Sequence, residues 1–204
     1  MKVRSSGPVP SGNVYDKYAS RNPFERALVG RFLSALDASL PARPPAQVLD
    51  LGAGEGVVSR RVLQRFPAAS VIGVDLAPPA GPAAWPEGGW QAVLADVARL
   101  PFVAAGAELV LAVELLEHVA DPRPVLAEIA RVAAGRVVLS VPKEPVWRAG
   151  NLLRGRYASR LGNTPGHLQH WSRREFRALV SGHLRVVEVR SPLPWTVVVA
   201  NAGP

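Results

Sequence analysis

The sequence predicts an α/β fold with a doubly wound sheet of seven strands, mostly parallel, that ends in an antiparallel hairpin. Short apolar runs with the length of buried strands alternate with amphipathic stretches of helical period, and this alternation is typical of parallel βαβ units. The last two apolar runs, Leu184–Val189 and Thr196–Ala200, instead follow each other around a short Pro-rich turn. They are therefore expected to form the hairpin.

The other elements are predicted from apolar runs and helix-capping signals. Five more strands are expected at Gln47–Leu51, Ser70–Val74, Trp90–Ala95, Glu108–Val113 and Arg136–Val141. Helices are expected to start at Asn22-Pro23, after Gly56, at Asp121-Pro122 and at the capping box of Ser172 and Glu175.

The N-terminal region is predicted to be a tail and helical cap over residues 1–45, with one globular domain over 46–204. The tail is rich in Ser, Gly and Pro and brings Tyr15 and Tyr18 close together. The helix that follows has an apolar stripe of Phe24, Leu28, Phe32, Ala35 and Leu36.

The composition excludes several kinds of chemistry. The chain has 204 residues, enough for one sizeable core, and contains no Cys, so no thiolate nucleophile and no Cys-ligated metal is available. No apolar run has transmembrane length and no signal peptide is visible, so we expect a cytoplasmic protein. The formal net charge of +8 indicates either a solvated Arg-rich surface or an anionic partner.

A glycine-rich turn follows the first predicted strand. Asp50 precedes Gly52, Gly54 and Gly56 at alternate positions. A dinucleotide site needs Gly-x-Gly-x-x-Gly, and here the third position of that pattern is Val57. Asp50 would repel a pyrophosphate and attract a ligand that carries an ammonium and a sulfonium group. S-adenosylmethionine (SAM) is such a ligand.

The acid-x-Gly-x-Gly-x-Gly turn resembles the first motif of class I SAM-dependent methyltransferases. Asp96-Val97-Ala98-Arg99-Leu100-Pro101-Phe102 resembles a second motif of that family, and Glu114-Leu115-Leu116-Glu117-His118-Val119-Ala120-Asp121-Pro122 resembles a third. The resemblance runs from Val48 to the C-terminus and is to small-molecule enzymes with a ubiquinone/menaquinone-methyltransferase-like domain. It implies a Rossmann-like sheet, SAM as cofactor and S-adenosylhomocysteine as product.

The resemblance also implies the cofactor site. Asp75, about 20 residues beyond the glycine turn, is placed to accept from ribose hydroxyls, as in other nucleoside folds. Asp96 is expected to accept from the adenine amino group. The full predicted set is Asp50, Gly52, Ala53, Gly54, Gly56, Asp75, Leu76, Asp96, Val97 and Glu114.

The acceptor site is expected after the fifth strand. His167 and His170, three positions apart beside Trp171, are our candidate general bases. We expect no metal, because no carboxylate stands at ligand spacing from these histidines. The predicted acceptor contacts are Tyr15, Tyr18, His118, Arg154 and Trp171, and the basic stretch 148–160 is either solvated or grips an anion or a membrane surface.

The predicted function is methyl transfer from SAM to oxygen or carbon of a small molecule, such as a lipid, a quinone-like compound or a specialised metabolite. The protein would be cytoplasmic or peripheral to a membrane, and its oligomeric state is left open. Two alternatives stay open: a SAM-binding protein of this fold that no longer methylates, such as a cyclase-like enzyme, and an RNA methyltransferase. No RNA-binding module is visible, so a nucleic-acid partner is not expected.

Overall fold

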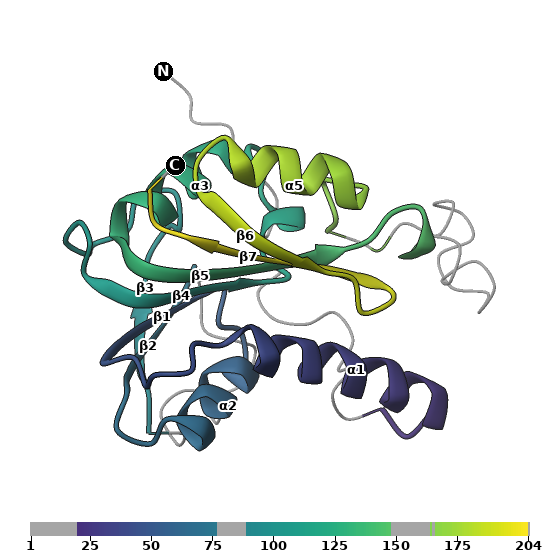
Figure 1. Cartoon of the computed structure of the whole chain (residues 1–204), viewed down its shortest axis with the longest axis horizontal. Coiled ribbons are helices and arrows are strands. Elements are labelled where there is room, and N and C mark those ends of the chain that lie inside the picture. The colour runs from purple at the N-terminus through teal and green to yellow at the C-terminus, as the bar shows by residue number, and fades with distance from the viewer. Residues whose placement is uncertain (1–19, 77–88, 148–163, 165, 204) are drawn as a thin grey trace, which may run out of the picture.

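A computed structural model describes residues 20–76, 89–147, 164 and 166–203 of the chain. Its centre is a seven-stranded sheet in the order β3-β2-β1-β4-β5-β7-β6 (Figure 1). The strands are β1 Gln47–Leu51, β2 Ser70–Asp75, β3 Gln91–Leu94, β4 Ala107–Val113, β5 Ala133–Pro142, β6 Arg185–Arg190 and β7 Trp195–Asn201. The first five are parallel, and β7 runs antiparallel between β5 and β6. The predicted fold class is confirmed.

Helices cover both faces of the sheet (Figure 1). α1 (Pro23–Ser39) and α2 (Val57–Arg65) lie on one face, and α3 (Pro122–Val132) and α5 (Arg173–Ser181) lie on the other. Three of the predicted N-caps are confirmed: Asn22 accepts from the first turn of α1, Asp121 accepts from α3, and Ser172 forms the capping box with Glu175. A 3₁₀ turn, η1 (Leu116–His118), follows β4.

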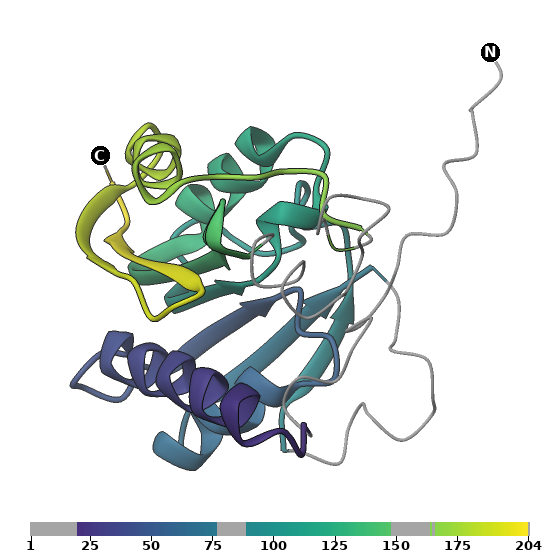
Figure 2. The same cartoon turned by 90° about the vertical axis from the view of Figure 1, so that its right-hand side faces the viewer.

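Each face of the sheet has its own core. One cluster contains Phe32 of α1 and Val62 of α2, and the other contains Ile129 of α3 and Phe176 of α5. Fully burying side chains of this size contributes about 1.5–3 kcal/mol each. Figure 2 shows the two helical layers from the side, with the sheet between them.

The predicted apolar stripe of α1 is wrong at its first position. Phe24 is 65% exposed, whereas the buried side chains of α1 include Glu25, Val29, Phe32 and Leu36. These four positions recur at the i, i+4, i+7 spacing of one helix face. The buried face is thus turned by about one residue from the predicted one, and Phe24 falls outside it.

The sheet order predicts a ligand-binding crevice beyond the carboxyl ends of β1 and β4. The chain builds outward from β1 through β2 to β3, and then returns to pair β4 with β1 on the other side. In open α/β sheets, ligands bind outside the carboxyl ends of the strands where the order reverses in this way. The loops after β1, β2, β3 and β4 therefore define the candidate site. No helix in the described part of the chain is both long and apolar enough to cross a membrane.

Candidate active site

The glycine-rich turn after β1 has the backbone that glycine permits. Gly52, Gly54 and Gly56 have φ of 71°, 50° and 71°. The amides of Gly52 and Ala53 donate to the Val74 carbonyl of β2 at 2.8 and 3.1 Å, which fixes the turn to the neighbouring strand. Gly56 is the N-cap of α2, so the free amides of that helix face the turn.

Glycines in and beside this turn serve two different purposes. A Cβ built at Gly54 meets no atom within 4 Å among the residues that the structure describes, so none of these residues fills the space over it. A Cβ at Gly56 would lie 2.4 Å from the indole of Trp90, and one at Gly73 of β2 would lie equally close to the same ring. Gly54 leaves room for a ligand, whereas Gly56 and Gly73 leave room for Trp90.

Asp75 at the end of β2 is held by two backbone amides. Its Oδ2 accepts from the amide of Gly54 at 2.9 Å, and its Oδ1 accepts from the amide of Leu76 at 2.8 Å. An ionised carboxylate has about four lone-pair positions, so two remain for ribose hydroxyls. The Leu76 side chain beside it is 52% exposed, and its contact with a cofactor stays a prediction.

Asp50 lies inside the protein. Its side chain is 1% exposed, and its Oδ2 accepts from the hydroxyl of Ser59 in α2 at 2.6 Å. Burial raises the pKa of the Asp50 carboxyl to about 6, the hydrogen bond from Ser59 opposes this shift, and the negative charge of Asp75 adds to it. Asp50 ties the turn to α2, and its direct contact with a cofactor stays a prediction.

Asp96 and Val97 stand after β3 in a loop fastened to α3. Asp96 is exposed, and its Oδ1 accepts from the amide of Ala98 at 2.9 Å, while Val97 is buried. Glu128 of α3 accepts from the amide of Leu100 further along this loop. The loop thus presents an exposed carboxylate beside a buried apolar residue, and the contact of both with adenine stays a prediction.

Glu114 follows β4 in the left-handed backbone region, with φ of 54°. Its amide donates to the Ser140 carbonyl of β5 at 3.0 Å, and its Oε1 accepts from the indole nitrogen of Trp195 at 2.6 Å. A non-glycine residue with positive φ costs roughly 1–2 kcal/mol. The contacts on both sides of Glu114 hold it there, at the edge where the cofactor is expected.

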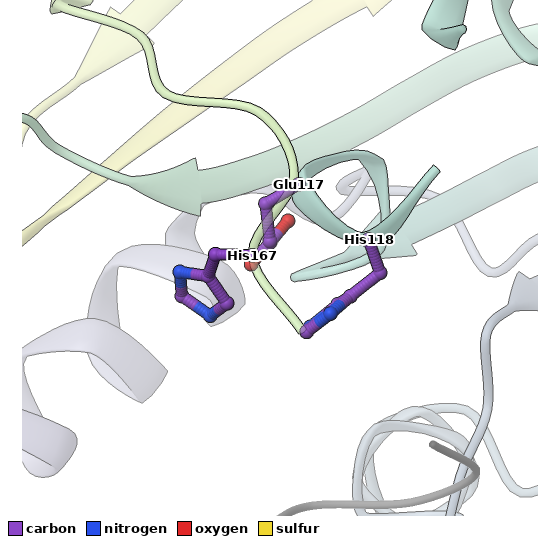
Figure 3. Close-up of side chains that lie close together, drawn as sticks. All are labelled: Glu117, His118 and His167. Carbon is purple, nitrogen blue, oxygen red and sulfur yellow. The ribbon is translucent and has the colours of Figure 1, made fainter. Parts of the chain in front are cut away.

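Two predicted site residues, His118 and His167, meet beyond β4 with a third residue that the sequence analysis did not select. The rings of His118 and His167 are 5.0 Å apart, and the Glu117 carboxylate completes a group whose ligand atoms lie within 4.8 Å of one another (Figure 3). Glu117 belongs to the Glu-His pair of the third motif, so the sequence did contain a signal that pointed to this residue. What the sequence lacked was the approach of His167.

Aromatic rings connect this group to the core. Trp147 stacks on His167 at 6.1 Å and meets Trp195 edge-on at 5.5 Å, and Trp195 stacks on Phe32 of α1 at 4.7 Å. The Trp147 indole nitrogen also donates to the Thr164 hydroxyl at 2.9 Å. The result is an aromatic wall that runs from α1 to the histidines on the side of the sheet where the acceptor is expected.

His170 and Trp171 are placed differently from His167. His170 is exposed, and Trp171 packs on Phe176 of α5 with ring centroids 5.6 Å apart, at the margin of the core. The structure therefore groups His118 with His167 and leaves His170 and Trp171 outside that group. Tyr15, Tyr18 and Arg154 lie outside the described residues, as do the Pro-rich segment 77–88 and the basic stretch 148–160.

Comparisons with known proteins agree with this geometry. A methyltransferase domain family matches residues 49–139. Malonyl-[acyl-carrier protein] O-methyltransferase of Halorhodospira halophila is 35% identical over 129 residues, which are 61% of this chain and 42% of that protein. The chain thus spans less than half the length of this curated relative.

Solved structures show the same fold. A chain from a Haloferax volcanii complex between the Trm112 methyltransferase activator and a methyltransferase superposes with a TM-score of 0.71, at 18% identity, over 93% of this chain and 96% of that one. A SAM-dependent methyltransferase of Aquifex aeolicus superposes with a TM-score of 0.68, at 15% identity, over 89% and 94%.

Residues 49–139 are similar to the methyltransferase domain family and the fold is that of solved SAM-dependent methyltransferases, which supports a class I enzyme with SAM as cofactor. The residues present fit that cofactor, because no atom of the described residues would crowd a side chain at Gly54 and Asp75 keeps acceptor positions beside the exposed Leu76. The ubiquinone/menaquinone-like subtype stays a prediction, as does the division of the chain at residue 45.

Proposed function

We propose that this domain transfers the methyl group of SAM to an oxygen of a small anionic acceptor. The observation that carries the proposal is the position of the Glu117–His118–His167 group and its aromatic wall, directly after β4 and beside Glu114 of the predicted cofactor site. Bound SAM supplies an electrophilic methyl group on a sulfonium. The residues of this chain hold that group and the acceptor together and exclude water, and such positioning supplies up to roughly 7–11 kcal/mol.

An anionic acceptor is supported by charge and by the relative. The net charge of +8 favours anionic ligands in general. The relative from Halorhodospira halophila is named for O-methylation of a malonyl group on an acyl carrier protein, and a malonyl group carries a carboxylate. A carboxylate is already nucleophilic, so its methylation needs no general base.

A hydroxyl acceptor would need a base, and His167 and His170 are the candidates. General-base catalysis contributes about 10²–10⁴-fold. His167 lies against the aromatic wall, whereas His170 is exposed, so the two variants His167→Ala and His170→Ala separate a base in the wall from one at the surface. Normal turnover in both would favour the carboxylate acceptor.

The test is methyl transfer from labelled SAM to a panel of acceptors. The panel contains malonyl thioesters, dicarboxylic acids, phenols and isoprenoid quinols, and mass spectrometry identifies the product. We expect labelled ester and S-adenosylhomocysteine from a carboxylate acceptor. SAM binding without product from any acceptor or cell extract would favour the non-methylating alternative, and salt-dependent binding of RNA would favour the RNA enzyme.

A further inference from the structure

Three side chains that can bind a metal come together from two distant parts of the sequence. Glu117 and His118 belong to η1, and His167 belongs to the segment before α5. In Figure 3 the Glu117 carboxylate lies beside the His167 ring, and His118 extends from the neighbouring turn toward the same space. One carboxylate with two imidazoles is the ligand set of zinc sites that keep a position open for substrate.

We propose that Glu117, His118 and His167 bind one divalent transition-metal ion of the zinc class, and that the ion holds a carboxylate oxygen of the acceptor. The second half of this proposal rests on the proposed function, and the first half does not. The sequence predicted no metal because it showed no carboxylate at ligand spacing from the histidines. The fold supplies that carboxylate from η1.

Backbone contacts hold the two segments together around the site. The amides of Leu168 and Gln169 both donate to the Glu117 carbonyl, at 2.7 and 3.1 Å, and the Gln169 side chain donates to the Ala120 carbonyl at 2.8 Å. These bonds fix the segment that carries His167 against η1. The ligand residues are thus brought into reach of one another by the fold, as a preorganised metal site requires.

The hydrogen bond of His118 suits a metal ligand. Its Nδ1 lies 3.0 Å from the Gly166 carbonyl, which can only accept, so Nδ1 carries the proton and the lone pair is on Nε2. Histidine ligands commonly donate their second nitrogen to a backbone carbonyl in this way, which fixes the tautomer and the ring orientation. The Gly166 carbonyl would therefore orient the His118 ring from outside the metal's own ligand set.

The spacing of the ligand atoms is close to what one ion needs. Zinc binds nitrogen and oxygen at about 2.0–2.2 Å, so two ligands of one ion lie no more than about 4.4 Å apart. The observed spread of up to 4.8 Å requires a small closure. The His118 side chain is exposed, and a shift of a few tenths of an ångström that keeps its hydrogen bond to Gly166 supplies this closure. A metal-bound His167 could not also act as a general base. Either His170 is then the base, or the acceptor is one, such as a carboxylate, that needs no base.

The experiment measures metal binding without SAM. Untagged protein is stripped with chelator and titrated with Co²⁺, followed by visible absorption and by calorimetry. We expect one Co²⁺ per chain, displaced by Zn²⁺. Glu117→Gln and His167→Ala should each lower the affinity at least about 10-fold, because loss of even an outer partner costs 10–100-fold. His183→Ala, which changes a histidine outside the group, is the matched control and should bind normally.

Several outcomes would overturn the proposal. Absence of Co²⁺ binding, or equal binding by the wild type, Glu117→Gln and His167→Ala, would exclude the site. If the buried Glu117 variant fails to fold, His118→Ala at the exposed position gives the same test. Malonate added to the Co²⁺ form should change its absorption bands, and unchanged bands would exclude the acceptor contact. S-adenosylhomocysteine binding, measured separately, shows whether the methyltransferase assignment stands when the metal site fails.

Discussion

Single residues in the glycine-rich turn separate ligand binding from folding. Gly54 and Gly56 both have positive φ, so a side chain at either position adds a similar backbone strain. In the described part of the chain, a Cβ at Gly54 meets no neighbour, whereas one at Gly56 would lie 2.4 Å from the Trp90 ring. The two positions are therefore a matched pair for mutation.

Gly54→Val should abolish SAM binding in a protein that still folds, because its side chain fills the space left for the cofactor. Gly56→Val, which adds the same side chain with similar backbone strain, should lower the thermal midpoint further than Gly54→Val does, because Trp90 has to move. Calorimetry with S-adenosylhomocysteine and thermal unfolding without ligand measure the two effects. Full affinity in a folded Gly54→Val protein would place the cofactor elsewhere.

Asp50 should make stability depend on pH. Burial raises its pKa from an ordinary value of 3.8 to about 6, so the folded protein binds this proton more tightly than the unfolded chain does. Its contribution to stability is therefore fully present below about pH 4 and is lost as the pH rises through about 6. The loss amounts to about 3 kcal/mol, from a shift of about two pKa units.

The measurement compares the wild type with Asp50→Asn. Urea unfolding of both proteins between pH 4 and 7, without ligand, gives the difference in unfolding free energy, in which the other titrating groups cancel. The wild type should lose about 2 kcal/mol relative to the variant across this range, because the full difference of about 3 kcal/mol is reached only below pH 4. A difference that does not change with pH would mean that Asp50 titrates normally in the folded protein.

At the scale of elements, α3 holds the loop that follows β3. Arg131 of α3 donates to the carbonyls of Leu100 and Phe102 at 3.0 and 2.7 Å, and it pairs with Glu128, which in turn accepts from the Leu100 amide. The pair with Arg131 lowers the pKa of Glu128. The loop that carries the predicted adenine contacts is thus positioned by α3, with which Val97 and Leu100 share one core cluster.

Arg131→Met should therefore weaken SAM binding although Arg131 lies outside the cofactor site. We expect a several-fold loss in affinity and a lower thermal midpoint, with an unchanged rate at saturating SAM. Arg123→Met, on the same helix, removes an exposed ion pair with Asp121 and is the control. If both variants bind SAM as well as the wild type does, the loop after β3 keeps its conformation without the hydrogen bonds from Arg131.

The elements were predictable because their signals are local. Asn22-Pro23, Asp121-Pro122 and Ser172 with Glu175 are caps within one turn of sequence, and the strands are continuous apolar runs. The errors arose where tertiary packing, and not the local sequence, decides which side chains are buried. Phe24 is exposed because the buried face of α1 is set by what lies opposite it, including Trp195 against Phe32.

The site was predictable only in part, for the same reason. The glycine spacing predicted the turn. Nothing local in the sequence predicted that Gly56 packs against Trp90 or that Asp50 accepts a hydrogen bond from Ser59. The approach of His167 to Glu117 depends on how the segment before α5 returns to η1. Such contacts join distant positions, and a single sequence carries no direct record of them.

The whole molecule should respond to its cofactor, because the predicted contacts come from loops after four strands on both sides of the crevice. A ligand that binds only the folded state stabilises it by mass action, by about 2.7 kcal/mol at 100 times its dissociation constant. For a chain of this length, each kcal/mol raises the thermal midpoint by roughly 2–4 °C. S-adenosylhomocysteine at that concentration should therefore raise the midpoint by about 5–10 °C.

NAD at the same concentration should leave the thermal midpoint unchanged, because the glycine spacing departs from a dinucleotide site at Val57. Gly54→Val should show no shift with either ligand, whereas Arg131→Met should show a smaller shift with S-adenosylhomocysteine. A rise with NAD and none with S-adenosylhomocysteine would contradict the cofactor assignment, whatever the acceptor proves to be.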